Sequence, residues 1–323
     1  MKSRIIKENA TFTYFRPRRG RRIRGQLKVI AENLFFTCLI KSSKPRHKEK
    51  RKYHISLCIM FKDEAVYLRE WIEYHRMIGV DHFYLYDNNS SDDYEKVVEP
   101  YIKDGIVTLI KWPHQQAQVK GYEDCIRRFQ SESDWIGFID VDEFIVPVEE
   151  ESLVSFLDRF SHRPAVLIYW RFFGSGGKMR RDVSRLVIED FYVASEKLYN
   201  KGKCFFNSDF EYLENSKKNK SMFHYLWTKS GKKILPPVDM YDKTTLSDFY
   251  WSRKKRPIPI QLNHYAVKTY EEHRNKDIKG DVYYGYPTHG DDVFFMRERR
   301  CSAPDFRIFK YITELKCRLG IDE

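Results

Sequence analysis

The pattern of hydrophobic and polar residues changes abruptly at Tyr53. Charged residues occur in runs before it, whereas the apolar run HISLCIMF after it has the length of a strand and ends in the charged turn KDE. Residues 65–79 then carry apolar side chains at near-helical spacing and end at Gly79, which predicts a helix. We therefore expect the folded domain to begin near residue 53.

Strand and helix patterns alternate regularly after this helix. The predicted elements are, in order, a strand in DHFYLYDNN, a helix in DDYEKVVEPYI, a strand in GIVTLIKW, a helix in VKGYEDCIRRFQ and a strand in DWIGFIDVDEFIVP. The strands are too continuously hydrophobic to have one wet face, which indicates an α/β fold with a mostly parallel sheet between two layers of helices. Such sheets bind ligands at the carboxyl ends of their strands.

The second half of the chain has a less regular pattern. It predicts a helix in SLVSFLDRF, strands in AVLIYWRFF and SRLVIEDFYVA with the flexible loop GSGG between them, further strands and turns from CFFNSDFEYL to KKILP, and a strand in PIPIQLNHYAVK before a helix in YEEHRNKDIKG. No linker of Pro, Ser or Gly character follows residue 52. We therefore predict one domain over residues 53–323, preceded by an extension of residues 1–52.

Composition narrows the class of protein. With 42% hydrophobic residues in 323, the chain can form a substantial core. No apolar run approaches the about 20 residues that a membrane-spanning helix needs, and no secretory signal is visible. The six Cys show neither a CxxC pair nor zinc spacing. We therefore expect ordinary thiols in a reducing compartment, the cytoplasm.

The positive charge is concentrated at one end of the chain. Of the formal net charge of +12, residues 1–52 carry +14, from 17 Lys or Arg against three Glu, and the remaining residues carry −2. Such a run is read either as a solvated tail or as a segment that adheres to an anionic membrane at its inner face, with Leu34, Phe35 and Phe36 as apolar contacts. Nucleic-acid binding is a third interpretation.

The segment WIGFIDVDEF carries the most informative side chains, because a hydrophobic strand ends there in Asp140, Asp142 and Glu143. Carboxylates packed so tightly repel one another. Oxygen ligands at positions i and i+2 suit a hard divalent cation that also holds a diphosphate, such as Mn²⁺ or Mg²⁺. The alternative is an acidic surface turn or a helix cap.

Two other strand ends carry polar residues. YLYDNNSSDD places Asp87 and Asn89 at the ligand-binding edge of the sheet, where Asp87 could accept a hydrogen bond from a base; the alternative is an Asx turn that caps the next helix. FKDE admits the same two interpretations for Asp63 and Glu64. The chain has no GxxxxGK[ST], GxGxxG or HExxH motif, so P-loop, simple Rossmann and zincin chemistries lack their signatures.

Together, these segments resemble glycosyltransferase family 92, nucleotide-sugar enzymes with the GT-A fold. The resemblance rests on FKDEAVYLREWIEYHRMIG, YLYDNNSSDD, GYEDCIRRF, WIGFIDVDEF, FFGSGG and LNHYAVKTYEEHRNKDIKG, in that order. It covers residues 54 to about 281, and the first 52 residues lie outside it.

The resemblance implies transfer of a sugar from a UDP-sugar to a glycan or lipid-linked glycan, with inversion. Asp140 and Asp142 would hold Mn²⁺ or Mg²⁺ on the diphosphate, and His264 fits the late His that GT-A enzymes commonly use as another ligand, with His224 as its rival. Asp87 would contact the uracil. The full set of predicted donor-binding residues is Lys62, Asp63, Glu64, Asp87, Asn89, Lys120, Asp124 and Asp140.

An inverting enzyme also needs a carboxylate that takes the proton of the acceptor hydroxyl. Glu189 in RLVIEDFY is the candidate, and Asp190 and Glu143 compete with it. Lys178 and His273 depart from the pattern of the family, so the acceptor is the least transferable feature.

Two other functions compete with sugar transfer. Asp140 and Asp142 would serve equally well in a metal-dependent nucleotidyl- or phosphotransferase, which would need a triphosphate loop near the first strand, and FKDEAVYL is not such a loop. The basic N-terminal segment could instead bind nucleic acid, but the −2 charge of residues 53–323 and their acidic cluster would repel a polyanion.

Overall fold

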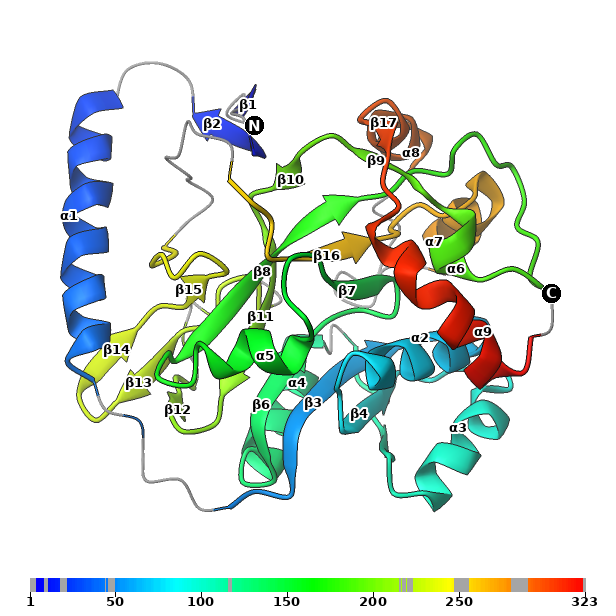
Figure 1. The fold of residues 1–323 in the computed structure, drawn as a ribbon, viewed down its shortest axis with the longest axis horizontal. Coiled ribbons are helices and arrows are strands. Elements are labelled where there is room, and N and C mark those ends of the chain that lie inside the picture. Colours follow the sequence, from blue (N-terminus) through cyan, green and yellow to red (C-terminus); the bar gives the residue numbers. More distant parts are fainter. Residues whose placement is uncertain are drawn as a thin grey trace.

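A nine-stranded sheet forms the centre of the molecule (Figure 1). The computed structural model describes residues 4–8, 11–17, 22–43, 45, 50–115, 118–214, 216, 219, 223–246, 256–279 and 290–321. The strand order is β5-β4-β3-β6-β11-β8-β16-β7, and β15 pairs with β8 outside this path.

The first half of the sheet is parallel, as the alternating pattern predicts. It consists of β3 (Tyr53–Phe61), β4 (His82–Asp87), β5 (Val107–Lys111) and β6 (Ser133–Phe138), with α2 (Ala65–Met77), α3 (Tyr94–Lys103) and α4 (Gln118–Phe129) as connecting helices. Gly79 follows α2 with φ +102°, a backbone conformation that favours glycine. These elements confirm the order that the sequence predicts.

The second half mixes strand directions. Strand β11 (Gly202–Asn207) runs antiparallel between β6 and β8 (Ala165–Phe172), β16 (Ile260–His264) runs parallel to β8, and β7 (Glu143–Pro147) closes the edge antiparallel to β16. The sheet is therefore mixed, with mostly parallel strands, and the architecture is the GT-A type that the resemblance implies.

The remaining elements are short and surround this sheet. They are α5 (Leu153–Asp158), α6 (Val187–Asp190), β9 (Val193–Ser195), β10 (Leu198–Tyr199), β12 (Glu211–Tyr212), β13 (Thr228–Ser230), β14 (Lys233–Leu235), β15 (Val238–Asp239), α7 (Tyr270–Lys279), α8 (Asp291–Glu298), β17 (Cys301–Pro304), η2 (Arg307–Tyr311) and α9 (Ile312–Leu319).

Two predicted strands are wrong, because each segment forms two elements in the structure. The single strand predicted in DWIGFIDVDEFIVP is two strands, β6 and β7, because residues 139–142 turn the chain and Glu143 N donates a hydrogen bond to Asp140 O over 3.0 Å. The strand predicted in SRLVIEDFYVA is the helix α6 followed by β9. The carboxylate of Glu70 accepts hydrogen bonds from the N–H groups of Val187 and Ile188, which stabilises the first turn of α6.

The N-terminal segment forms β1 (Arg4–Glu8), β2 (Phe12–Pro17) and α1 (Arg22–Lys41). Strand β2 pairs with β10, and Phe12, which is 0% exposed, lies with its ring centroid 4.8 Å from that of Tyr169 on β8. Ile40 of α1 is also buried. These contacts do not support the interpretation of residues 1–52 as a solvated tail. The domain boundary after residue 52 stays a prediction.

The C-terminal elements return to the first half of the fold. Strand β17 pairs with β9, and α9 packs beside α2 (Figure 1). Among the described residues, no helix has both the length and the apolar character to cross a bilayer.

We predict that Phe12→Ala lowers the free energy of unfolding of the whole chain by about 3–5 kcal/mol, because it opens a cavity in the core. Leu34→Ala, at a residue 64% exposed on α1, is the control and should change it by no more than about 0.5 kcal/mol. Urea unfolding of the full-length protein measures both values. Equal stability of the two variants would show that Phe12 contributes nothing to the folded body.

Candidate functional site

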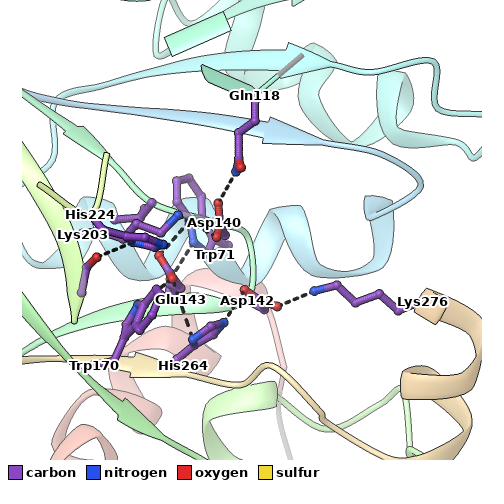
Figure 2. Close-up of polar contacts among 12 residues, drawn as sticks. Trp71, Gln118, Asp140, Asp142, Glu143, Trp170, Lys203, His224, His264 and Lys276 are labelled. Carbon is purple, nitrogen blue, oxygen red and sulfur yellow. Dashed lines mark hydrogen bonds and ion pairs between the residues drawn. The ribbon is translucent and has the colours of Figure 1, made fainter. Parts of the chain in front are cut away.

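The turn between β6 and β7 gathers three acidic side chains at the carboxyl edge of the parallel strands (Figure 2). Glu143 is 0% exposed. Its Oε1 accepts a 2.7 Å hydrogen bond from Trp170 Nε1, and its Oε2 accepts a 2.9 Å hydrogen bond from the backbone N–H of Asp140. Burial raises the pKa of Glu143 well above its ordinary value. Because both carboxylate oxygens are occupied, Glu143 stabilises the shape of the turn.

Asp140 is bound to three side chains from other elements, one of which is the Tyr122 hydroxyl of α4, 3.2 Å from Oδ1. Lys203 Nζ on β11 lies 2.8 Å from Asp140 Oδ2, and Gln118 Nε2 at the start of α4 donates to Oδ1 over 2.8 Å. Burial tends to raise the pKa of Asp140, but the buried Lys203 ammonium outweighs it and holds that pKa below its usual value. Asp140 is therefore a carboxylate, and its side chain is 29% exposed, which leaves it open to a ligand.

Asp142 and His264 face each other. The sheet brings them together, since Glu143 on β7 pairs in register with His264 on β16 and Tyr265 N donates to Asp142 O over 2.8 Å. His264 Nε2 lies 3.5 Å from Asp142 Oδ1, and Lys276 Nζ of α7 lies 2.7 Å from Asp142 Oδ2.

These contacts set the charges of the pair. Burial tends to raise the pKa of Asp142, but Lys276 and His264 outweigh it and hold that pKa well below its ordinary value. Burial lowers the pKa of His264, although Asp142 opposes this shift. An ionised carboxylate beside an imidazole that burial holds toward its neutral form is a pair that suits a metal ion.

The geometry of this group fits a divalent cation. One ligand atom from each of Asp142, Glu143 and His264 lies within 4.8 Å of the others. Asp142 Oδ1 accepts no regular hydrogen bond in the described part of the chain, whereas both oxygens of Glu143 are occupied. Two ligand atoms that each lie about 2.1 Å from one ion, in directions at right angles, are about 3 Å apart. The distance of 3.5 Å between Asp142 Oδ1 and His264 Nε2 is close to this value. Asp142 and His264 are therefore the best-placed ligands.

The rival histidine has a different environment. His224 Nδ1 lies 2.8 Å from the carbonyl oxygen of Gly202, so it carries the proton and donates it. Its ring packs against Trp170 at 4.8 Å between centroids, and burial lowers its pKa to about 3. These contacts tie His224 to β11 and β8, whereas His264 faces Asp142.

Asp87 and Asp63 are used within their own loops. Asp87 is buried, with Oδ1 accepting from Ser90 N and Oδ2 from the Tyr94 hydroxyl, which is the polar-turn alternative for this residue. Asp63, at φ +51°, accepts from Ser91 N over 2.6 Å and thereby joins the loops that follow β3 and β4. Asn89 has φ +59° and is exposed at the same edge.

The other predicted donor-binding residues divide into two groups. Glu64 lies close enough to the acidic turn to interact with Asp142 and Asp140. Burial raises the pKa of Glu64 to about 7; these two carboxylates add to the rise, and Lys276 and Lys268 oppose it. Asp124 instead binds Arg127, Arg128 and the Tyr86 hydroxyl. Lys120 is exposed on α4, and Lys62 is partly exposed after β3.

The three candidates for the catalytic base are separated. Glu143 is enclosed in the turn, as described above. Glu189 pairs with Lys316 of α9 at 3.0 Å, while its neighbour Asp190 is buried and pairs with Lys178, which follows the glycine loop. Asp190 Oδ2 has no hydrogen-bond partner among the described residues. The two adjacent carboxylates of α6 therefore have different lysine partners, and both also lie near Arg185, at 3.9 Å for Glu189 and 3.5 Å for Asp190.

Several residues of the site were not predicted from the sequence, among them Gln118, Trp170, Lys203 and Lys276. Lys203 had a visible signal, since a single lysine inside the apolar strand GKCFF needs a buried anion as its partner. Gln118, Trp170 and Lys276 had none, because only the tertiary structure brings them to the acidic turn.

The fold and this site define a class: an α/β protein of GT-A type with an acidic site at the carboxyl edge of its sheet. The model of the family described as glycosyltransferase family 92 matches residues 51–270, which is more than half of the chain. The chain therefore belongs to glycosyltransferase family 92.

Curated relatives agree with this assignment over part of the chain. A glycosyltransferase family 92 protein from Oryza sativa subsp. japonica is 34% identical over 122 residues, 38% of this chain and 21% of the relative. A galactan beta-1,4-galactosyltransferase from Arabidopsis thaliana is 36% identical over 105 residues, 29% of this chain and 21% of the relative. The matches span about a fifth of the length of these relatives.

Solved structures resemble the chain only loosely. The crystal structure of S. aureus TarS in complex with UDP has a TM-score of 0.33 and 13% sequence identity, covering 58% of this chain and 60% of that one. Glucosyl-3-phosphoglycerate synthase from Mycobacterium tuberculosis, in complex with Mn²⁺, UDP and glucosyl-3-phosphoglycerate, has a TM-score of 0.27 and 13% identity, covering 51% and 65% of the two chains. A likeness of this size carries no argument about the site.

We predict that Lys203→Met lowers the free energy of unfolding by about 3 kcal/mol, because it leaves the Asp140 carboxylate without its buried cation. The variant Lys203→Met/Asp140→Asn should lose less than the single variant, since it also removes the unpaired charge. A double-mutant cycle by urea unfolding measures this coupling. If the loss in the double variant equals the sum of the losses in Lys203→Met and Asp140→Asn, the pairing of these two residues is contradicted.

Proposed function

We propose that this chain is a metal-dependent, inverting glycosyltransferase that moves a sugar from a UDP-sugar to a glycan acceptor. The observation that carries the proposal is the facing pair of Asp142 and His264 at the carboxyl edge of the sheet, inside the segment that matches family 92. The chain offers one carboxylate oxygen and one imidazole there for a hard divalent ion, Mn²⁺ or Mg²⁺.

The residues around this pair have distinct functions in the proposal. When bound, the ion stabilises the negative charge that develops on the leaving diphosphate. Asp142 and His264 hold it, and Asp140 adds a carboxylate whose direction is fixed by Gln118 and Lys203. Lys276 pairs with Asp142 Oδ2, and its side chain is 48% exposed, so its ammonium group is placed to contact the diphosphate oxygens as well.

The sugar donor lies, in this proposal, across the loops that follow β3 and β4. The Asp63–Ser91 contact holds these two loops together, and Asn89 presents an exposed amide beside them. Asp87 supports the loop through Ser90 and Tyr94. We therefore assign Asp87 an indirect contribution to uracil binding, through the shape of the turn.

Asp190 is the better candidate for the base that deprotonates the acceptor hydroxyl. Its unpartnered Oδ2 can take a proton, and its contact with Lys178 places it beside the glycine loop. The backbone of Lys178 also accepts a hydrogen bond from Tyr270 N, the first residue of the helix that carries Lys276. Glu189, which pairs with Lys316, is the matched comparison.

Three Arabidopsis thaliana relatives are galactan beta-1,4-galactosyltransferases, 34–36% identical to short segments of this chain. We therefore propose a polysaccharide or lipid-linked glycan as acceptor, with β-1,4-galactan oligosaccharides and UDP-galactose as the first probes.

We predict that Asp142→Asn abolishes Mn²⁺-dependent release of UDP from the UDP-sugar and leaves the fold intact, because an amide has nearly the same shape but lacks the charge that holds the ion. A coupled assay for UDP measures the rate, and circular dichroism checks the fold. Asp104→Asn, at an exposed position after α3, is the matched control and should keep wild-type activity.

His264→Ala should share the metal defect, whereas His224→Ala should keep the dependence on Mn²⁺ concentration. Normal turnover by Asp142→Asn would refute the metal site. If only His224→Ala lost the dependence on Mn²⁺ concentration, the metal ligand would be His224 in place of His264.

We predict that Asp190→Asn lowers kcat for transfer by at least about 100-fold with little change in the KM for the UDP-sugar, because it removes proton transfer and keeps binding. Glu189→Gln should retain most of the activity. Initial rates with a saturating acceptor measure both variants. The opposite ranking would assign the base to Glu189, and full activity of both would move the base elsewhere, with Glu64 as the next candidate.

A further inference from the structure

Helix α1 has an inner face that attaches it to the body. The ring centroid of Phe36 lies 5.6 Å from that of Trp227, and Thr37 Oγ1 lies 3.0 Å from Thr244 Oγ1. Ile40, four residues after Phe36 and three after Thr37, is 2% exposed. Because residues at this spacing share one side of a helix, these contacts fix which side of α1 faces the protein.

The outer face of α1 carries apolar side chains that are exposed among the described residues. Ile30, Leu34 and Phe35 are 46%, 64% and 60% exposed, and Cys38, one turn after Leu34, is exposed as well. Helical spacing places Leu34, Phe35 and Cys38 on the side away from Phe36 and Ile40, with Ile30 at the edge of this face that is nearest Thr37. Figure 1 shows α1 at the periphery of the molecule, with only its inner side toward the body. A contiguous exposed apolar face of this kind marks an interaction site.

Basic residues surround the C-terminal end of this face. Lys41, the last residue of α1, is exposed. Lys233 Nζ donates a 2.9 Å hydrogen bond to Ser42 O, which brings the lysine pair of Lys232 and Lys233 to the same end of the helix. The sequence of residues 1–52 as a whole carries a net charge of +14. The C-terminal end of the apolar face therefore lies beside Lys41, Lys232 and Lys233.

We propose that the outer face of α1 docks on an anionic lipid bilayer, with Ile30, Leu34 and Phe35 in the headgroup region and the basic residues on anionic headgroups. Exposed apolar side chains can enter the headgroup region, and the nearby Lys41, Lys232 and Lys233 can each contact an anionic headgroup. Nucleic acid would use the basic residues and leave the aliphatic side chains uncovered. A second copy of this chain, which has a formal net charge of +12, would bring a second segment of net charge +14 against the first.

This surface is independent of the proposed reaction. None of Ile30, Leu34 and Phe35 belongs to the acidic turn or its partners, so a failure of docking and a loss of catalysis are separate outcomes. Docking would place the enzyme on the surface that carries lipid-linked acceptors, and the attraction would be screened by salt.

The test uses full-length protein and flotation with vesicles of phosphatidylcholine containing about 30% phosphatidylserine, against vesicles of phosphatidylcholine alone. We expect binding to the anionic vesicles at about 0.1 M NaCl and its loss near about 1 M. Leu34→Gln/Phe35→Gln should lower the bound fraction at least about fivefold. Ile102→Gln/Val183→Gln, at residues 40% and 72% exposed elsewhere, is the matched control and should bind as wild type.

Tryptophan fluorescence tests directly whether position 35 enters the bilayer. Phe35→Trp should show a blue-shifted emission when anionic vesicles are added, because the indole leaves water. Emission that does not move, or equal binding by Leu34→Gln/Phe35→Gln and wild type, would overturn the proposal. It would also be overturned if sedimentation showed wild type as a dimer that Leu34→Gln/Phe35→Gln dissociates, or if the protein bound duplex DNA and no vesicles.

Discussion

The structure depends on neutralising three carboxylates that a single buried turn brings together. Asp140, Asp142 and Glu143 lie within four residues, and two of them are almost fully enclosed by protein. Isolated buried charges are too costly to persist, so each needs a cation or hydrogen-bond donors. These come from distant parts of the chain: Lys203 of β11, Trp170 of β8, His264 of β16 and Lys276 of α7. The order of strands in the second half of the sheet is therefore also the assembly of the site.

The same constraint gives the three acids different properties. Glu143 receives hydrogen bonds from neutral donors while two carboxylates lie nearby, so burial raises its pKa and it stabilises the turn. Asp142 lies beside Lys276 and His264, which keep it ionised against burial. Asp140 is held between Lys203 and Gln118 with part of its side chain exposed. Local environment thus divides one acidic motif into a structural residue and two candidate ligands.

The features that could be predicted from the sequence are those set by residues close together in the chain. The parallel first half of the fold, the acidic turn and the late His follow from local patterns and from the family resemblance. The break between β6 and β7 was missed because FIVP after the acids is as apolar as WIGF before them. Gln118, Trp170 and Lys276 were missed because their partners are far away in the sequence. The packing of residues 1–52 on the body was missed for the same reason, since Phe12 contacts the distant Tyr169. Periodicity does not encode such contacts.

The most direct test of the metal site is a crystal of the full-length protein grown with Mn²⁺ and UDP and measured at the manganese absorption edge. We predict one anomalous peak, from an ion that the Asp142 carboxylate and His264 Nε2 coordinate beside the diphosphate. A peak at another set of side chains, or bound UDP with no peak at this turn, would contradict it.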